Sequence, residues 1–116
     1  MTAVFSSKSL VGKVLQGNYL LERLVGKGGM AWVFRARHTK LQEVMAVKIL
    51  LPHIAEDETV RRRFLDEGKI QFRLKHPNIV QVTDLLEDDN LIGIVLEWID
   101  GDDLKALMKR VRAPMP

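Results

Sequence analysis

The stretch GKGGMAWVFRAR, residues 26–37, places glycines at positions 26, 28 and 29 directly before an alternating apolar run. The preceding segment YLLERLV (19–25) is rich in apolar residues and predicts a strand that ends at the glycines. AWVFRAR (31–37) alternates with the period of two that is typical of a strand. The glycines therefore join two strands, and glycine-rich connections let groups such as phosphates approach the backbone closely.

Two common nucleotide-binding sites are excluded by this arrangement. In the dinucleotide-binding fold, glycines at similar spacing open a helix, whereas a strand follows them here. A P-loop requires Gly-Lys-Ser/Thr after the turn, and this sequence has none there. The glycine connection is therefore either a plain hairpin turn or a phosphate-binding loop of another kind.

One lysine, Lys48, interrupts the next apolar segment, VMAVKILL (44–51), which predicts a buried strand. Lysine is almost never fully buried without a partner, because its ammonium group loses its hydration. The sequence is therefore expected to supply an anion near Lys48.

The candidate anion comes from residues 57–74, whose spacing predicts one long amphipathic helix. The residues predicted on its inward face are Val60, Phe64, Gln71 and Leu74. Glu67 falls among them, whereas the neighbouring Asp66 points about 100° away. Glu67 is therefore the predicted partner of Lys48, in an ion pair that is either functional or purely structural.

The remaining segments complete an α+β pattern. IVQVTDLLE (79–87) and LIGIVLEW (91–98) flank Asp-Asp-Asn and predict a hairpin of two strands. A short helix is predicted over 103–112. Residues 1–16 are small, polar and mixed, and are expected to form a flexible N-terminal lead-in.

The composition indicates one soluble globular domain, with 47% hydrophobic and 28% charged residues in a chain of 116. The absence of cysteine excludes disulfides and thiolate metal sites, and the three histidines are too dispersed for a zinc cluster. No signal peptide and no apolar run of about 20 residues is present, so a cytoplasmic location is expected. The basic residues are mostly interleaved with acidic ones, which favours solvated surfaces over a nucleic-acid site.

Five segments, in this order, resemble the small N-terminal lobe of the eukaryotic-like protein kinases, and in particular the bacterial serine/threonine kinases. They are GNYLLERLVGKGGMAWVFRARH, MAVKIL, RRFLDEGK, LKHPNIVQV and IVLEWIDGDDL. The resemblance implies an α+β fold: a five-stranded antiparallel sheet, one large helix at about 57–74, and the start of the first large-lobe helix at about 103–112. It assigns 17–99 to the kinase small lobe and 100–116 to the hinge exit and that helix.

The same resemblance implies ATP as the ligand. The loop residues that would cover its triphosphate are Gly26, Lys27, Gly28 and Gly29. Lys48 would hold the α- and β-phosphates, and Glu67 would position Lys48. These two residues are the implied catalytic pair of this lobe.

The resemblance also implies which residues form the adenine and ribose sites. Val33, Ala46 and Leu96 would line the adenine slot. The main-chain carbonyl of Glu97 and the amide of Ile99 would meet the adenine edge, and Asp103 would lie near the ribose. No metal ligand is expected in this chain, and magnesium would be bound by other parts of the parent kinase.

Three residues depart from the family pattern. Ala31 replaces the third glycine of the loop and is small enough to be tolerated. Gly68 lowers helix propensity by about 1 kcal/mol relative to alanine, so the helix around Glu67 is expected to be easily displaced. Gln71 takes a place that is usually apolar in active kinases, and its amide must find a partner or water.

The sequence contains no His-Arg-Asp catalytic loop and no Asp-Phe-Gly motif, which supply the catalytic base and the magnesium ligands of kinases. The chain is therefore expected to be an inactive piece of a kinase more than twice as long. Its parent would transfer the γ-phosphate of ATP to serine or threonine hydroxyls of protein substrates. The alternative is a pseudokinase or stand-alone small lobe that acts as a regulatory or interaction module. A homodimer through the exposed inter-lobe face, including 103–112, is also predicted.

Overall fold

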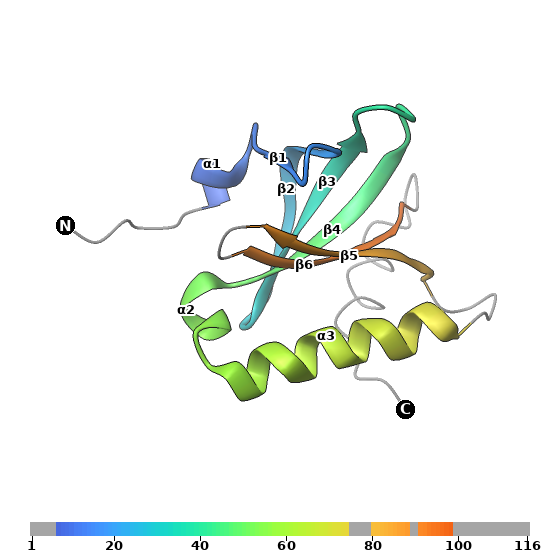
Figure 1. The fold of residues 1–116 in the computed structure, drawn as a ribbon. Helices are drawn as coiled ribbons and strands as arrows, with labels where there is room; N and C mark the ends of the chain where they lie inside the picture. Colours follow the sequence, from blue (N-terminus) through green and yellow to red (C-terminus); the bar gives the residue numbers. More distant parts are fainter. Residues whose placement is uncertain (1–6, 75–79, 89–90, 99–116) are drawn as a thin grey trace.

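The computed structural model describes residues 7–74, 80–88 and 91–98, which form an antiparallel sheet with one long helix against it (Figure 1). The strands are β1 Val14–Leu15, β2 Tyr19–Lys27, β3 Ala31–His38, β4 Val44–Leu50, β5 Val82–Asp88 and β6 Leu91–Glu97. The helices are α1 Ser7–Leu10, α2 Pro52–Ala55 and α3 Glu58–Arg73. The strand order is β1-β2-β3-β4-β6-β5, and every neighbouring pair is antiparallel.

The five predicted strands and the long helix are confirmed, but the sheet has a sixth strand. Residues 7–15, predicted as part of the lead-in, contain α1 and β1 instead. Leu10 and Leu15 explain the difference, because their side chains are only 0% and 2% exposed in the core. The short helix α2 was also not predicted. The predicted helix over 103–112 lies outside the described residues.

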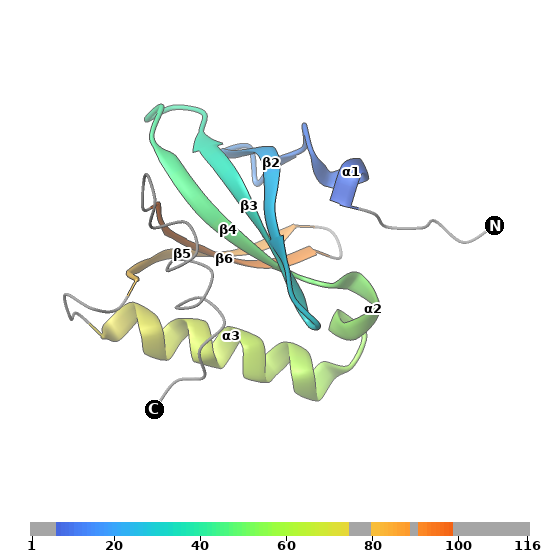
Figure 2. The same cartoon turned by 180° about the vertical axis from the view of Figure 1, so that it is seen from behind.

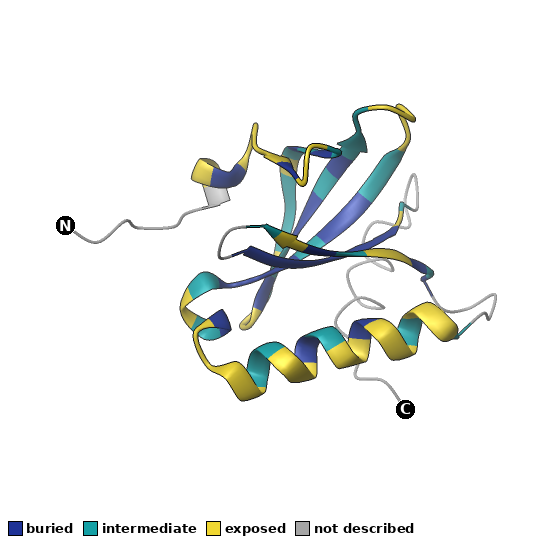
Figure 3. Cartoon of the chain, viewed as in Figure 1, coloured by how far each residue is buried: buried dark blue, intermediate teal, exposed yellow. Residues whose placement is uncertain are grey.

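The sheet carries apolar side chains on both faces, so the fold has two packed clusters. The cluster on the side of α3, here called the helix-side face, is formed by Ala31, Val33, Ala46, Leu50, Ala55, Phe64, Val80, Val82, Ile92, Ile94 and Leu96. The cluster on the opposite face is formed by Leu10, Leu15, Tyr19, Leu21, Phe34, Ala36, Val47, Ile49, Leu86, Leu91 and Val95. Figure 3 shows the buried stripe of α3 turned toward the sheet.

Helix α3 begins at a side-chain cap and lies very close to the sheet. The carboxylate of Asp57 accepts hydrogen bonds from the backbone N–H groups of Thr59 and Val60 at 2.9 and 3.3 Å. Gly68 is buried, and a Cβ atom there would lie 2.8 Å from Leu85 Cδ2 and 3.0 Å from Ile94 Cδ1. The glycine that weakens the helix locally thus permits its close contact with β5 and β6.

The edge strand β5 is joined to the other end of the sheet by hydrogen bonds from Gln16, directly after β1, and from Tyr19 of β2. The backbone N–H of Gln16, directly after β1, donates to Asp88 Oδ2 at 2.6 Å, and its Nε2 donates to the Glu87 carbonyl at 2.9 Å. The hydroxyl of Tyr19 donates to Asp84 Oδ2 at 2.8 Å. The sheet therefore curls around the cluster on its second face, and Figure 2 shows this curvature from behind.

The Tyr19 hydroxyl predicts a loss of stability at high pH. Burial, then the hydrogen bond and negative charge of Asp84, raise the pKa of Tyr19 from 10.0 to about 12. Because the folded chain holds this proton more tightly than the unfolded chain, the stabilisation is present below pH 10 and is lost as the pH rises toward 12. The expected loss is about 2 kcal/mol, measured by urea unfolding between pH 9 and 12. Tyr19→Phe should show a flatter profile over this range, and identical profiles would contradict the assignment.

Candidate nucleotide-binding site

The glycine connection is a tight hairpin between β2 and β3. The backbone N–H of Gly28 donates to the Ala31 carbonyl at 2.8 Å, which leaves Gly29 and Met30 at the tip. The Met30 carbonyl accepts a hydrogen bond of 2.9 Å from the backbone N–H of Leu51, directly after β4. This bond holds the hairpin tip beside the end of β4, and in Figures 1 and 2 the tip lies next to α2, the helix that follows β4.

Gly29 has no conformational or packing requirement for glycine within the described part of the chain. The described glycines with positive φ are Gly12 and Gly17, so Gly29 has a backbone that any residue can adopt. A Cβ atom on Gly29 would also have no neighbour within 4 Å. The backbone at Gly29 is therefore unobstructed on that side, which leaves room for a group that approaches it.

The side chain of Lys27 lies on the face of the hairpin away from Val33. Lys27 pairs with Trp32 across the strands, and its Nζ lies 5.5 Å from the Trp32 ring centroid. Trp32 packs against the cluster on the second face of the sheet, whereas Val33 belongs to the helix-side face. Lys27 is one of the residues predicted to cover the triphosphate. On the Val33 side of the hairpin only its backbone is available for this, because its side chain lies on the opposite face.

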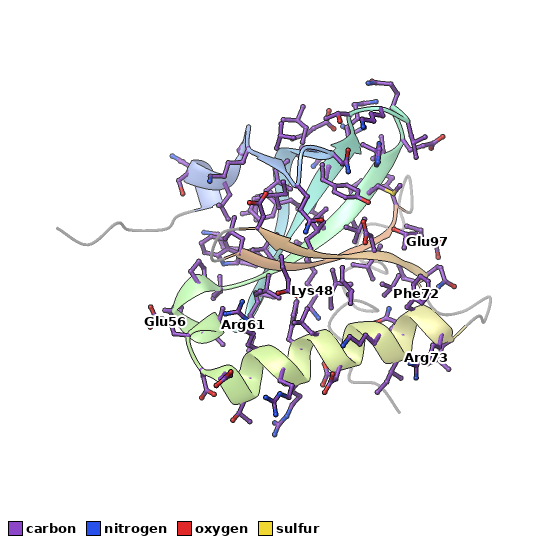
Figure 4. The ribbon with its side chains drawn as sticks, viewed as in Figure 1. Lys48, Glu56, Arg61, Phe72, Arg73 and Glu97 are labelled. Carbon is purple, nitrogen blue, oxygen red and sulfur yellow. The ribbon has the colours of Figure 1, made fainter. Side chains whose placement is uncertain are left out.

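Lys48 lies in β4 between two apolar cross-strand neighbours. It pairs with Val33 of β3 on one side and with Ile94 of β6 on the other. Its side chain is half-buried, with Nζ 5.6 Å from the ring centroid of Phe64 in α3. Burial lowers the pKa of Lys48, and the negative charge of Glu67 acts in the opposite direction. Figure 4 shows Lys48 between the sheet and α3. Phe64 is a neighbour that the sequence analysis did not assign, although it lies one helical turn before Glu67.

Glu67 is exposed, which corrects the prediction that it lies on the inward stripe of the helix. Phe64 and Gly68 are the buried residues of α3, and Glu67 lies at the margin of the stripe that they form. The close contact of Gly68 with the sheet sets this rotation of the helix. The charge of Glu67 nevertheless acts on Lys48, so its role as the partner of Lys48 stays a prediction with electrostatic support.

The three residues predicted to line an adenine slot lie together. Val33, Ala46 and Leu96 are 3%, 0% and 1% exposed and belong to one cluster on the helix-side face. Ala46 pairs directly with Leu96, and it shares its sheet face with Lys48 two residues later. The lysine ammonium thus borders an apolar surface made by three adjacent strands.

Glu97 ends β6 and is tied on one side to the segment before β5. Its backbone N–H donates to the Gln81 carbonyl, and its Oε1 accepts from the Gln81 N–H, both at 2.9 Å. Figure 4 shows Glu97 at the end of β6. The other predicted contacts of this region, Ile99 and Asp103, lie outside the described residues.

The departures from the family pattern are accommodated locally. Ala31 is 8% exposed and packs in the helix-side cluster, which accounts for its methyl group in place of a glycine. The amide of Gln71 finds the expected partner, because its Nε2 donates to the Val80 carbonyl at 2.9 Å. Among the residues that the structure describes, no group of metal-ligating side chains is present, and no helix is long and apolar enough to cross a membrane.

Comparison with known proteins places these features in one family. Residues 19–115 match the protein kinase domain. The chain is 42% identical over 96 residues to the serine/threonine-protein kinase PrkC of Bacillus subtilis, covering 83% of this chain and 15% of PrkC. It is 39% identical over 101 residues to the serine/threonine-protein kinase pkn3 of Myxococcus xanthus, covering 86% of this chain and 18% of pkn3.

A solved structure agrees with the sequence relatives. The PknI kinase domain of Mycobacterium tuberculosis superposes with a TM-score of 0.65 and 32% identity, covering 97% of this chain and 44% of that domain. The chain thus spans less than a fifth of these two curated relatives and under half of this solved kinase domain. The matched residues, the sheet and the long helix agree, and the chain belongs to the protein kinase family, with relatives among the bacterial serine/threonine kinases, and covers the N-terminal part of its domain.

Proposed function

We propose that this chain is the ATP-binding small lobe of a serine/threonine protein kinase. The observation that carries the proposal is the position of Val33, which pairs with Gly26 of the glycine hairpin on one side and with Lys48 on the other. The glycine hairpin, an ammonium group and an apolar surface therefore meet on the four neighbouring strands β2, β3, β4 and β6. This combination suits a flat apolar base joined to a chain of phosphates.

Each part has a distinct task in this proposal. Val33, Ala46 and Leu96 offer an apolar wall to the adenine ring. The ammonium group of Lys48 offsets the charge of the α- and β-phosphates, and the nearby charge of Glu67 favours the protonated form that this requires. Magnesium would neutralise the remaining phosphate charge, and its ligands would come from the part of the parent kinase beyond this lobe.

The parent protein would transfer the γ-phosphate of ATP to a serine or threonine hydroxyl of a protein substrate. This step moves the phosphoryl group from the β-phosphate oxygen to the substrate oxygen, and a base takes the hydroxyl proton. The small lobe positions the nucleotide, and the base belongs to the rest of the kinase. The chain by itself is therefore expected to be inactive.

The isolated chain should bind ATP only weakly. The solved PknI kinase domain is more than twice the length that this chain covers, and its remainder would supply the opposite wall of the adenine slot. We therefore expect a dissociation constant of about 1 mM or weaker, equivalent to about −4 kcal/mol. Titration with ATP and magnesium, followed by calorimetry or by NMR shifts, measures it. Micromolar binding would contradict the view that the small lobe contributes only part of the affinity.

A regulatory or interaction module is the second candidate, and one observation favours it. The amide of Gln71 bonds to the Val80 carbonyl at a place that is usually apolar in active kinases. Such a lobe would bind nucleotide weakly, or not at all, and would act through a protein partner. The homodimer predicted through residues 103–112 remains a prediction, since that segment lies outside the described residues.

A further inference from the structure

Arg35 is a charged residue on the helix-side face of the sheet, and it lies between Arg23 of β2 and the apolar Ala46 of β4. It pairs with Ala46, which in turn pairs with Leu96, so the three side chains share that face. Ala46 and Leu96 are buried, whereas the side chain of Arg35 is 28% exposed. A guanidinium group therefore borders the proposed adenine slot on the side away from Lys48.

Two contacts hold this guanidinium group in place. Arg35 Nη1 donates to Glu22 Oε1 at 2.6 Å, and Glu22 Oε2 accepts a second bond, from Arg37 Nε, at 3.0 Å. On its other side, Arg35 Cζ lies 5.8 Å from the ring centroid of Trp98. Glu22, Arg35 and Trp98 thus form a chain of contacts from β2, across β3, to the residue that directly follows β6.

Trp98 adjoins the backbone that would meet the adenine edge. Glu97 is held on one side by its two hydrogen bonds with Gln81. Trp98 packs partly buried against the helix-side cluster, and its ring meets the Arg35 guanidinium. A cation that faces an aromatic ring restrains the ring, and with it the attached backbone.

We propose that Arg35 is a positioning residue for the nucleotide, which acts by holding Trp98 and the adjoining backbone beside the adenine slot. This inference rests on the proposed function. A partly exposed arginine–glutamate pair adds little stability by itself, and the apolar side chains of Ala46 and Leu96 offer no partner to a guanidinium group. The contact with Trp98 therefore accounts for a charged residue at this position better than a contribution to stability does.

Arg37 provides a matched control. It is also in β3, bonds to the same Glu22 carboxylate, and has a side chain of 33% exposure against 28% for Arg35. The structure shows a ring contact with Trp98 for Arg35 and not for Arg37 among the described residues. Arg37→Leu therefore removes a comparable ion pair and leaves the Trp98 contact in place.

The first measurement tests the contact itself by fluorescence. The chain has two tryptophans, so Trp32→Phe leaves Trp98 as the single tryptophan. In this background Arg35→Leu should shift the Trp98 emission to longer wavelength and raise its quenching by acrylamide, and Glu22→Gln should act in the same direction. Arg37→Leu should change neither property. Equal responses of the Arg35 and Arg37 variants would overturn the inference.

The second measurement tests the effect on nucleotide. ADP is titrated into each folded variant and followed by NMR, with circular dichroism as the check on folding. Arg35→Leu should weaken ADP binding by about threefold, which corresponds to the loss of one cation–π contact, and Arg35→Lys should recover part of it. The Arg37→Leu variant should bind ADP as tightly as the unsubstituted chain. Unchanged binding by Arg35→Leu would overturn this inference alone, whereas ADP shifts in the unsubstituted chain that leave Val33, Ala46, Lys48 and Leu96 unaffected would overturn the proposed function and this inference with it.

Discussion

Lys48→Met, in a protein that contains the complete kinase domain, is expected to lower phosphoryl transfer by about a hundredfold to a thousandfold or more. The change removes the ammonium group that would hold the α- and β-phosphates and leaves a side chain of similar length. Because burial lowers the pKa of Lys48, the folded lobe disfavours the charged form. Methionine removes the cost of burying this charge, so the variant should be at least as stable as the unsubstituted protein.

The matching assay is transfer of labelled phosphate to a protein substrate, with urea unfolding as the measure of stability. Lys40→Met is a suitable control, since Lys40 is exposed in the turn between β3 and β4, away from the proposed site. Unchanged turnover in Lys48→Met would refute the assignment of Lys48. If the unmodified protein transfers no phosphate while its small lobe binds nucleotide, the regulatory function becomes the better account.

Gly68→Leu is expected to lower the free energy of unfolding by about 2–3 kcal/mol. Its Cβ atom alone would lie 2.8 Å from Leu85 Cδ2 and 3.0 Å from Ile94 Cδ1, and three further carbons must also find space. The helix would have to move away from β5 and β6 to make room. The gain in helix propensity, about 1 kcal/mol relative to glycine, offsets only part of the loss.

Urea unfolding followed by circular dichroism measures this effect, and Lys69→Leu is its control. Lys69 is the next residue of the same helix and is exposed, so leucine there adds similar bulk without meeting the sheet. Gly68→Ala should be much milder, because the far end of Leu85 can rotate and alanine is a better helix former. A Gly68→Leu variant as stable as the unsubstituted chain would show that the close contact of α3 with β5 and β6 does not limit the size of residue 68.

The same variant links packing to function. Moving α3 outward would carry Glu67 away from Lys48 and would weaken the influence of its charge on the ammonium group. In a complete kinase domain, Gly68→Leu should therefore also reduce phosphoryl transfer. The small size of Gly68 would therefore matter to the site although Gly68 itself does not touch the nucleotide.

Local sequence patterns determined most of the sheet and the position of the long helix. The alternation on both sides of the glycines required two strands joined by a hairpin, and an isolated lysine in an apolar strand identified Lys48 as chemically unusual. Asp57 and the apolar spacing after it placed the start of α3 within one residue of where the structure has it. These features depend on residues close together in the chain, which is why they can be recognised there.

The tertiary structure decided which residues from distant segments meet. Helical periodicity placed Glu67 on the inward stripe, but the close contact of Gly68 with Leu85 and Ile94 rotates the helix and leaves Glu67 at the margin. The two leucines that make α1 and β1 part of the fold lie in too short a segment to show a period, and only the curled sheet buries them. The contacts through Arg35 join β2, β3 and the residue after β6, and they too depend on packing between segments that are distant in the sequence. Periodicity encodes which face of an element is apolar, whereas packing between elements sets their rotation and their neighbours.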